Sequence, residues 1–221
     1  MSELLIVDPS THVAEHEAVR EVAEVWGGPT VLWRPALHEV QSPRTADECA
    51  GIVILGSRAS VVDSFPWLEE LGTFLKPILS GRVSRPVLGV CFGHQYLCYL
   101  LGGEVGFLTP GHEKKVAVET TRFTSSRWCP EGGEFPVVCS HREIVSDIAG
   151  TGLRAIASRP DVQIDAVEHS ELPIFGCQFH PEARLEFGQN CGLDLRRKLP
   201  QLESAGRELL GGFFRTVVSE R

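Results

Sequence analysis

The sequence predicts a three-layer α/β domain with a mainly parallel central sheet. In the first half, short runs rich in Val, Ile and Leu alternate with helical patterns, and in the second half further strand patterns follow one another. The run at 51–55 is apolar at successive positions, as expected of a strand covered on both faces in a parallel sheet. This succession favours a single domain over residues 1–221.

The first half supplies the parallel strands and the helices between them. We expect strands at 4–7, 30–33, 51–55 and 86–90. A helix over 12–26 is expected to end at two glycines. The next helix has Pro66 at its start and a regular apolar face comprising Trp67, Leu68, Leu71, Phe74, Leu75 and Ile78. A third helix is expected to follow Cys91 at once and to continue to about Leu101.

The second half is richer in strands. Expected strands lie at 115–120, 136–139, 153–157, 163–168 and 174–179. The polar stretch from 181 to 200 has no clear period and is left unassigned. A last helix shows one apolar face, made of Leu202, Ala205, Leu209, Leu210, Phe213, Phe214 and Val217.

Composition excludes several classes of function. The net charge of −8 argues against a general nucleic-acid binder, which needs a basic surface. No apolar stretch is long enough to span a membrane, and the short apolar run after Glu3 is flanked by acids, unlike a signal peptide. The seven cysteines are odd in number and irregular in spacing, which indicates reduced thiols and a cytoplasmic protein.

Residues 89–93 have the form of a nucleophile elbow, Gly-x-Cys-x-Gly. Glycines at both flanks allow a sharp strand-to-helix turn that leaves Cys91 exposed at a helix N-terminus, where the helix dipole favours a thiolate. The backbone N–H of Phe92 would then point toward a developing oxyanion. A buried structural cysteine in a tight turn is the alternative for this motif.

A second motif, at 176–182, places His180 at the end of an apolar strand and Glu182 two residues later. Residues i and i+2 of an extended chain point the same way, so Glu182 can orient the imidazole as the acid of a catalytic triad. The alternative is an ordinary surface histidine. Cys177 and His180 could form half of a metal site, but no second pair has ligand spacing, so no metal is expected.

The two motifs together resemble those of the class I (triad-type) glutamine amidotransferase family. The matching segments are Gly-Val-Cys-Phe-Gly-His-Gln at 89–95 and Gln-Phe-His-Pro-Glu at 178–182, and His180 follows Cys91 by 89 residues. The resemblance covers roughly residues 4–182 and is strongest to free-standing members. It implies a flavodoxin-like fold and the catalytic set Cys91, His180 and Glu182, with no metal and no organic cofactor.

The resemblance also implies a binding site. The family's Gly-Gly-Pro oxyanion loop is replaced here by Gly56-Ser57-Arg58, which gives the backbone N–H of Ser57 as the second oxyanion donor beside Phe92. Other residues are expected to bind the substrate: Gly56, Gln95, Ser140, His141 and Arg142. Arg142 stands where the family has a small glycine, so the amino-acid pocket is expected to differ.

The expected reaction is hydrolysis of the glutamine side-chain amide through a γ-glutamyl thioester on Cys91. The chain has neither a phosphate-binding Gly-x-x-x-x-Gly-Lys-Ser/Thr motif nor a Gly-x-Gly-x-x-Gly motif. Ammonia would therefore pass to a separate acceptor or to a synthase subunit in trans. Two alternatives stay open: a free-standing hydrolase of γ-glutamyl amides or peptides, and a catalytically inactive binding module of the same fold.

Overall fold

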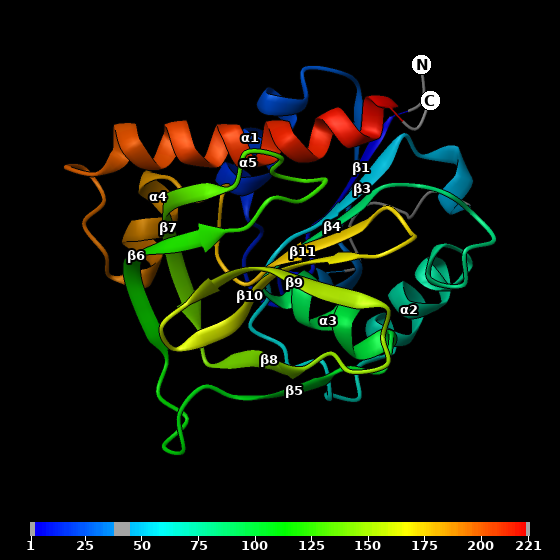
Figure 1. Cartoon of the computed structure of the whole chain (residues 1–221), viewed down its shortest axis with the longest axis horizontal. Coiled ribbons are helices and arrows are strands. Elements are labelled where there is room, and N and C mark those ends of the chain that lie inside the picture. Colours follow the sequence, from blue (N-terminus) through cyan, green and yellow to red (C-terminus); the bar gives the residue numbers. More distant parts are fainter. Residues whose placement is uncertain (1–2, 38–44, 220–221) are drawn as a thin grey trace.

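A nine-stranded sheet forms the centre of the protein, whose computed structural model describes residues 3–37 and 45–219 (Figure 1). In order across the sheet the strands are β2 (Thr30–Trp33), β1 (Leu4–Val7), β3 (Gly51–Ile54), β4 (Val87–Val90), β11 (Ile174–Cys177), β10 (Val162–His169), β9 (Leu153–Arg159), β6 (Lys115–Phe123) and β7 (Gly133–His141).

The half of the sheet from β2 to β11 is parallel throughout. Its order, β2-β1-β3-β4 followed by β11, is that of flavodoxin-like folds, so the predicted fold class is confirmed. Beyond β11 each strand pairs antiparallel with its neighbour, which widens the sheet. Parallel strands end at the same edge of a sheet, so the segments after β3, β4 and β11 meet there.

Helices cover both faces of the parallel half. Helices α1 (His16–Trp26) and α5 (Leu199–Ser219) lie on one face, and α2 (Pro66–Leu79) and α3 (Phe92–Leu100) lie on the other (Figure 1). Side chains of a strand alternate between the faces. In β1, Leu4 and Ile6 accordingly pack in the cluster that contains α1 and α5, whereas Leu5 and Val7 pack with α2 and α3. The three predicted layers are present.

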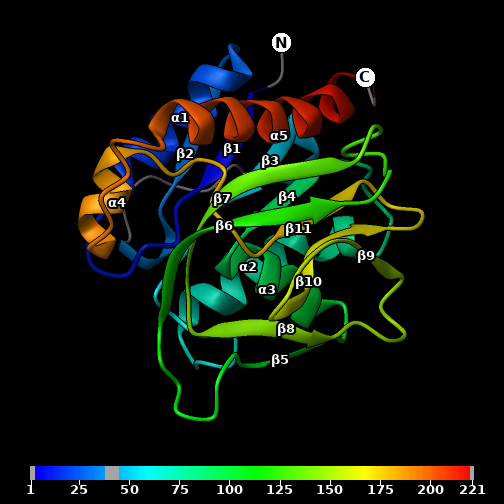
Figure 2. The same ribbon diagram turned by 60° about the vertical axis from the view of Figure 1, so that its left-hand side comes forward.

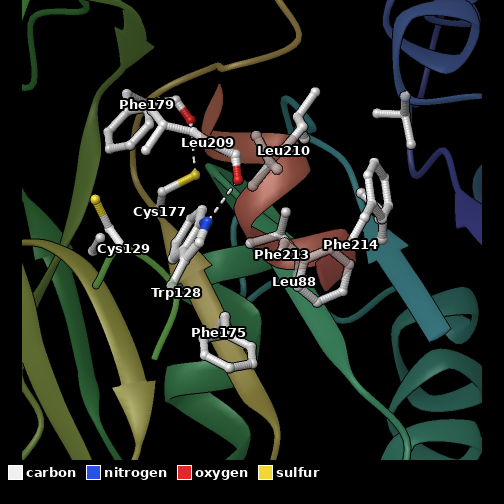
Figure 3. Packing of buried hydrophobic residues seen from close by; sticks show 14 of the residues in the cluster. Leu88, Trp128, Cys129, Phe175, Cys177, Phe179, Leu209, Leu210, Phe213 and Phe214 are labelled. Atoms are coloured by element: carbon white, nitrogen blue, oxygen red, sulfur yellow. Dashed lines mark hydrogen bonds between the residues drawn. The ribbon is translucent and has the colours of Figure 1, made fainter. Parts of the chain in front are cut away.

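Helix α5 is fastened to the sheet by aromatic packing (Figure 3). The indole N–H of Trp128, in the loop between β6 and β7, donates to the backbone oxygen of Leu209 at 2.7 Å. Phe175 of β11 makes edge-on contacts with Trp128 and with Phe213, at centroid distances of 6.2 and 6.0 Å. These contacts fix β11, and with it the segment that carries His180, against the core.

The predicted helix over 12–26 begins instead at His16. Asp8, buried at the end of β1, explains the difference. Its carboxylate accepts from the backbone N–H groups of Ser10 and Glu15, at 3.2 and 3.1 Å. These bonds hold residues 8–15 as a loop. The backbone N–H groups of Ser10 and Glu15 donate to the side chain of Asp8 and are not available for bonds within a longer α1.

Several elements were not predicted. Strands β5 (Glu104–Phe107) and β8 (Glu143–Asp147) form a separate two-stranded antiparallel sheet, seen below the main sheet in Figure 2. Helix α4 (Leu185–Cys191) lies in the unassigned polar stretch, and short 3₁₀ helices occupy Pro35–Leu37 and Ala46–Glu48. No helix in residues 3–37 and 45–219 is long and apolar enough to cross a membrane.

Candidate active site

Cys91 occupies a sharp turn between β4 and α3, as the elbow pattern predicts. Its backbone has φ 52° and ψ −102°, a strained conformation for a residue with a side chain. A Cβ on Gly89 would lie 2.4 Å from the backbone of Gly93, and a Cβ on Gly93 would lie 2.3 Å from the backbone oxygen of Ile54. Both flanking glycines are therefore required by close approach of the backbone.

His180 lies at the same edge of the sheet, just beyond β11. Its backbone N–H donates to Val138 of β7 at 2.9 Å, and its ring packs on Phe187 of α4 with a centroid distance of 4.4 Å. Because β11 is the neighbour of β4, with Cys177 opposite Val90, the segments that follow the two strands emerge side by side. Histidine and cysteine meet at Gly56, where a Cβ would lie 2.9 Å from His180 Cε1 and 3.7 Å from Cys91 Cβ.

Glu182 fixes the orientation of the His180 imidazole. His180 Nδ1 lies 2.7 Å from Glu182 Oε1, and both side chains are buried. Burial alone would lower the pKa of His180, but the Glu182 carboxylate and the Cys91 sulfur outweigh it, so this pKa is raised well above its usual value. The arrangement favours an imidazolium that faces Cys91.

Cys91 lies between two cavities. One, of about 450 Å³, is lined by several of the predicted binding residues, namely Ser57, Gln95, Ser140, His141 and Arg142. The other, of about 220 Å³, is lined by Gly56, His180 and Glu182, together with Glu15 and Cys191. Arg58 and Lys114 line both cavities. Cys91 can thus be reached from two sides.

The two predicted oxyanion donors, Ser57 and Phe92, follow the neighbouring strands β3 and β4. Phe92 begins α3, so its N–H belongs to the first turn, where amides have no acceptor within the helix. Its ring is buried against Trp67 and Tyr96, which leaves only the backbone for chemistry. In Ser57 the side chain donates to the backbone oxygen of Pro9 at 2.8 Å, which fixes the loop that carries the backbone N–H.

The side chain of His141 is buried and neutral, and it lines the larger cavity. Burial and the charge of Arg159 lower its pKa to about 3. A terminal nitrogen of Arg159 lies 3.3 Å from His141 Nε2, and a guanidinium can only donate, so Nε2 must accept and the proton must sit on Nδ1. Arg159 is itself held by Asp165 at 2.8 Å and by Glu119. Nδ1 is buried and has no partner in the described part of the chain, so it is a spare donor.

Gln95 is a predicted substrate-binding residue in the first turns of α3. It lines the larger cavity, but its side-chain nitrogen donates to the backbone oxygen of Glu143 at 2.7 Å and to Gln178 Oε1 at 3.1 Å. Gln178 contacts the Cys91 sulfur, and no role for it was predicted from the sequence. Its position two residues before His180, on the same side of an extended segment, was the available signal.

His94, in the first turns of α3, is fully buried, and burial lowers its pKa to about 4. In the unfolded chain a histidine takes up a proton near pH 6.5. The stabilising effect of neutral His94 is therefore complete above pH 6.5 and is lost as the pH falls toward 4. Relative to His94→Gln, we expect the wild-type free energy of unfolding to drop by about 2 kcal/mol more between pH 7 and pH 4.5.

Urea unfolding of both proteins at the two pH values measures this difference. If the free energy of unfolding fell by the same amount between pH 7 and pH 4.5 in wild type and in His94→Gln, the assignment of His94 as a buried neutral residue would be contradicted. The two proteins measured at pH 7 serve as the reference. A packing defect of His94→Gln lowers its free energy of unfolding at both pH values, so it cancels when the two pH values are compared.

In residues 3–37 and 45–219, no group of three or more His, Cys, Asp or Glu side chains could hold a metal ion. All seven cysteines are free thiols, and all but Cys191 are buried. The described residues bring Cys91, His180 and Glu182 together at this edge of the sheet.

Comparison with known proteins agrees with this geometry. The model of the family "Glutamine amidotransferase class-I" matches residues 14–191. The glutamine-hydrolyzing GMP synthase subunit of Methanopyrus kandleri is 32% identical over 148 residues, covering 64% of this chain and 72% of that protein. Anthranilate synthase component 2 of Methanothermobacter marburgensis is 36% identical over 115 residues, covering 52% of this chain and 58% of its own length.

Solved structures share the fold. A glutamine amidotransferase of Thermotoga maritima superimposes with a TM-score of 0.76 at 16% identity, covering 100% of this chain and 98% of that one. A glutamine amidotransferase of Methylobacillus flagellatus gives 0.75 at 16% identity, covering 99% and 95%.

Proposed function

The chain belongs to the class-I glutamine amidotransferase family, and on that premise we propose that Cys91, His180 and Glu182 are its catalytic residues. It is a cysteine-dependent enzyme that hydrolyses the side-chain amide of glutamine. The observation that carries the assignment of residues is the buried His180–Glu182 contact of 2.7 Å, presented to Cys91 from a neighbouring strand.

The proposed reaction has two halves. The Cys91 thiolate attacks the γ-carbonyl carbon, and the backbone N–H groups of Phe92 and Ser57 stabilise the oxyanion. The His180 imidazolium gives its proton to the leaving ammonia as the C–N bond breaks. A water molecule then gives a proton to the neutral imidazole and attacks the thioester, which releases glutamate and restores the thiolate–imidazolium pair.

The larger cavity fits the amino-acid end of glutamine. Arg142 can donate to the α-carboxylate, the Glu143 side chain can accept from the α-ammonium group, and His141 lines the same cavity. Ser60 Oγ donates to the Glu143 carboxylate at 3.0 Å and so orients it. Three further residues complete the proposed binding surface. Gly56 has no side chain and leaves space for the substrate beside Cys91, and Ser140 lines both cavities. Gln95 donates to the backbone oxygen of Glu143 and so fixes the segment that carries this carboxylate.

We propose that the ammonia is used by a synthase on a separate polypeptide. The relatives carry the names of an anthranilate synthase component and a GMP synthase subunit, which supports a partner in trans. We also propose that residues 1–221 form one domain, since the sheet runs unbroken from β2 to β7. The free cysteines support a cytoplasmic location.

One observation favours a second candidate, a free-standing γ-glutamyl hydrolase. The larger cavity is lined by three cationic side chains, those of Arg58, Lys114 and Arg142, but by only one carboxylate, that of Glu143. None of the three cations has an ion-pair partner in the described residues. Glutamine has one carboxylate for these cations. A γ-glutamyl amino acid has a second carboxylate on its leaving amine, which would reach Arg58 and Lys114.

A matched substrate set separates the two. The purified protein is incubated with glutamine, γ-glutamylglycine and γ-glutamylethylamide, and glutamate release is measured. A protein that waits for a synthase is expected to cleave glutamine slowly, while a diazoketone analogue of glutamine still labels Cys91. Rapid cleavage of γ-glutamylglycine, with much slower cleavage of the ethylamide that lacks the carboxylate, would establish the second candidate. No cleavage and no labelling would contradict both.

A further inference from the structure

A glutamine amide is in direct contact with the nucleophile. Gln178 lies between β11 and His180 and is completely buried. Its side-chain nitrogen Nε2 is 3.6 Å from the sulfur of Cys91. Gln178 lines neither of the two cavities, so its amide is not positioned to bind substrate.

The neighbours of Gln178 determine which end of its amide faces the sulfur. The backbone oxygen of Glu143 can only accept, so the atom of Gln95 that lies 2.7 Å from it must be the amide nitrogen. The same nitrogen lies 3.1 Å from the side chain of Gln178, which must therefore present its oxygen there. The NH₂ group of Gln178 is left to face Cys91, so this orientation follows from the network.

A second group near the sulfur acts in the opposite sense. The backbone oxygen of Ser140 lies 4.0 Å from Cys91 Sγ, and a carbonyl can accept only from the protonated thiol. An amide N–H can donate to the sulfur and stabilises the thiolate more than the thiol, because a bond to a charged acceptor is the stronger one. Gln178 and His180 thus both favour the thiolate, the reactive form of this sulfur.

We propose that Gln178 is a catalytic residue that donates its amide N–H to the Cys91 sulfur and maintains the thiolate for attack. Gln95 acts as its positioning residue, because it fixes the orientation of the Gln178 amide from the backbone of β8. The proposal rests on the proposed function, since the sulfur concerned is the nucleophile of that reaction. No proton is transferred to or from Gln178; the thiol proton resides on His180.

The test compares wild type with Gln178→Met, which keeps the volume and removes the donor. Alkylation of Cys91 by iodoacetamide is followed from pH 5 to pH 9 by mass spectrometry of the Cys91 peptide. We expect the midpoint of the alkylation profile to rise by about one pH unit and the rate at pH 6 to fall about tenfold. In glutamine hydrolysis, kcat should fall while KM stays near the wild-type value.

A second variant and a control keep the result decisive. Gln178→Glu has the same shape but places a carboxylate against the sulfur, so its midpoint should rise further. Phe179→Leu removes buried volume from the adjacent position and keeps the Gln178 amide, so its alkylation profile should match wild type. The other charged and titratable groups around Cys91 are unchanged in all three variants: His12, Glu15, Arg58, Lys114, His141, Arg142, Glu143, Cys177, His180, Glu182 and Cys191.

The proposal is overturned if Gln178→Met and Gln178→Glu, both folded by circular dichroism, keep the wild-type alkylation midpoint. A common loss of stability in these variants and in Phe179→Leu, with no shift of midpoint, would show a structural role only. Failure of the proposed function would look different: glutamine cleavage would persist in a protein without Cys91, whatever the alkylation profiles of the Gln178 variants.

Discussion

Cys91→Ser is expected to lower kcat/KM for glutamine by at least about a thousandfold. A serine hydroxyl holds its proton far more tightly than a thiol, so it cannot form an ion pair with His180. Removal of the sulfur also removes one of the groups that raise the pKa of His180, so both members of the reacting pair change. Glutamate release from glutamine, measured over hours at high protein concentration, gives the residual rate.

The matched control for this variant is Cys129→Ser, in the loop between β6 and β7. Cys129 Sγ donates to the backbone oxygen of Gly132, a bond that a hydroxyl can also make, and the residue lines neither cavity. This variant should hydrolyse glutamine at the wild-type rate. A Cys91→Ser protein that keeps more than a tenth of wild-type activity would remove Cys91 from the role of nucleophile.

Gly93→Ala is expected to destabilise the protein by about 3 kcal/mol or more and to abolish glutamine hydrolysis. The new methyl group would lie 2.3 Å from the backbone oxygen of Ile54 and 2.9 Å from its Cβ. Backbone atoms of a buried strand have no room to move aside, so α3 must separate from β3. The helix N-terminus that carries the Cys91 turn then shifts relative to His180.

Urea unfolding and activity assays on Gly93→Ala are compared with those on Gly106→Ala in β5. A Cβ on Gly106 would have no atom within 4 Å, so this substitution tests the removal of a glycine without a clash. We expect its midpoint of unfolding to stay close to wild type. If the two variants unfolded at the same urea concentration, close packing of the elbow would not be the reason for Gly93.

The sequence predicted best what depends on local pattern. The strands at 4–7 and 30–33 have the predicted bounds, because each is a short run of apolar or β-branched residues followed by a charged residue. Cys91 and His180 could also be found, since the elbow needs its glycines in sequence and the triad acid follows its histidine by two residues. These signals lie within a few neighbouring residues.

Features that depend on contacts across long stretches of chain were not visible. The start of α1 is set by Asp8, whose carboxylate takes the backbone donors of a loop seven residues away. Strand β8 could not be recognised, because its partner β5 lies about forty residues earlier and the pair is partly exposed. The tautomer of His141 depends on Arg159, and the orientation of Gln178 depends on a backbone oxygen of β8.

The pairing of β4 with β11 has a consequence for the synthesis of the chain. The 88 residues between Cys91 and His180 emerge from the ribosome after the nucleophile and before its base, and strands β6 to β10 are made within that interval. A parallel strand inserted from so far along the chain pairs late in folding. A nascent or partly folded chain therefore carries a thiol without an imidazole beside it, and it gains the power to hydrolyse glutamine only when β11 takes its place.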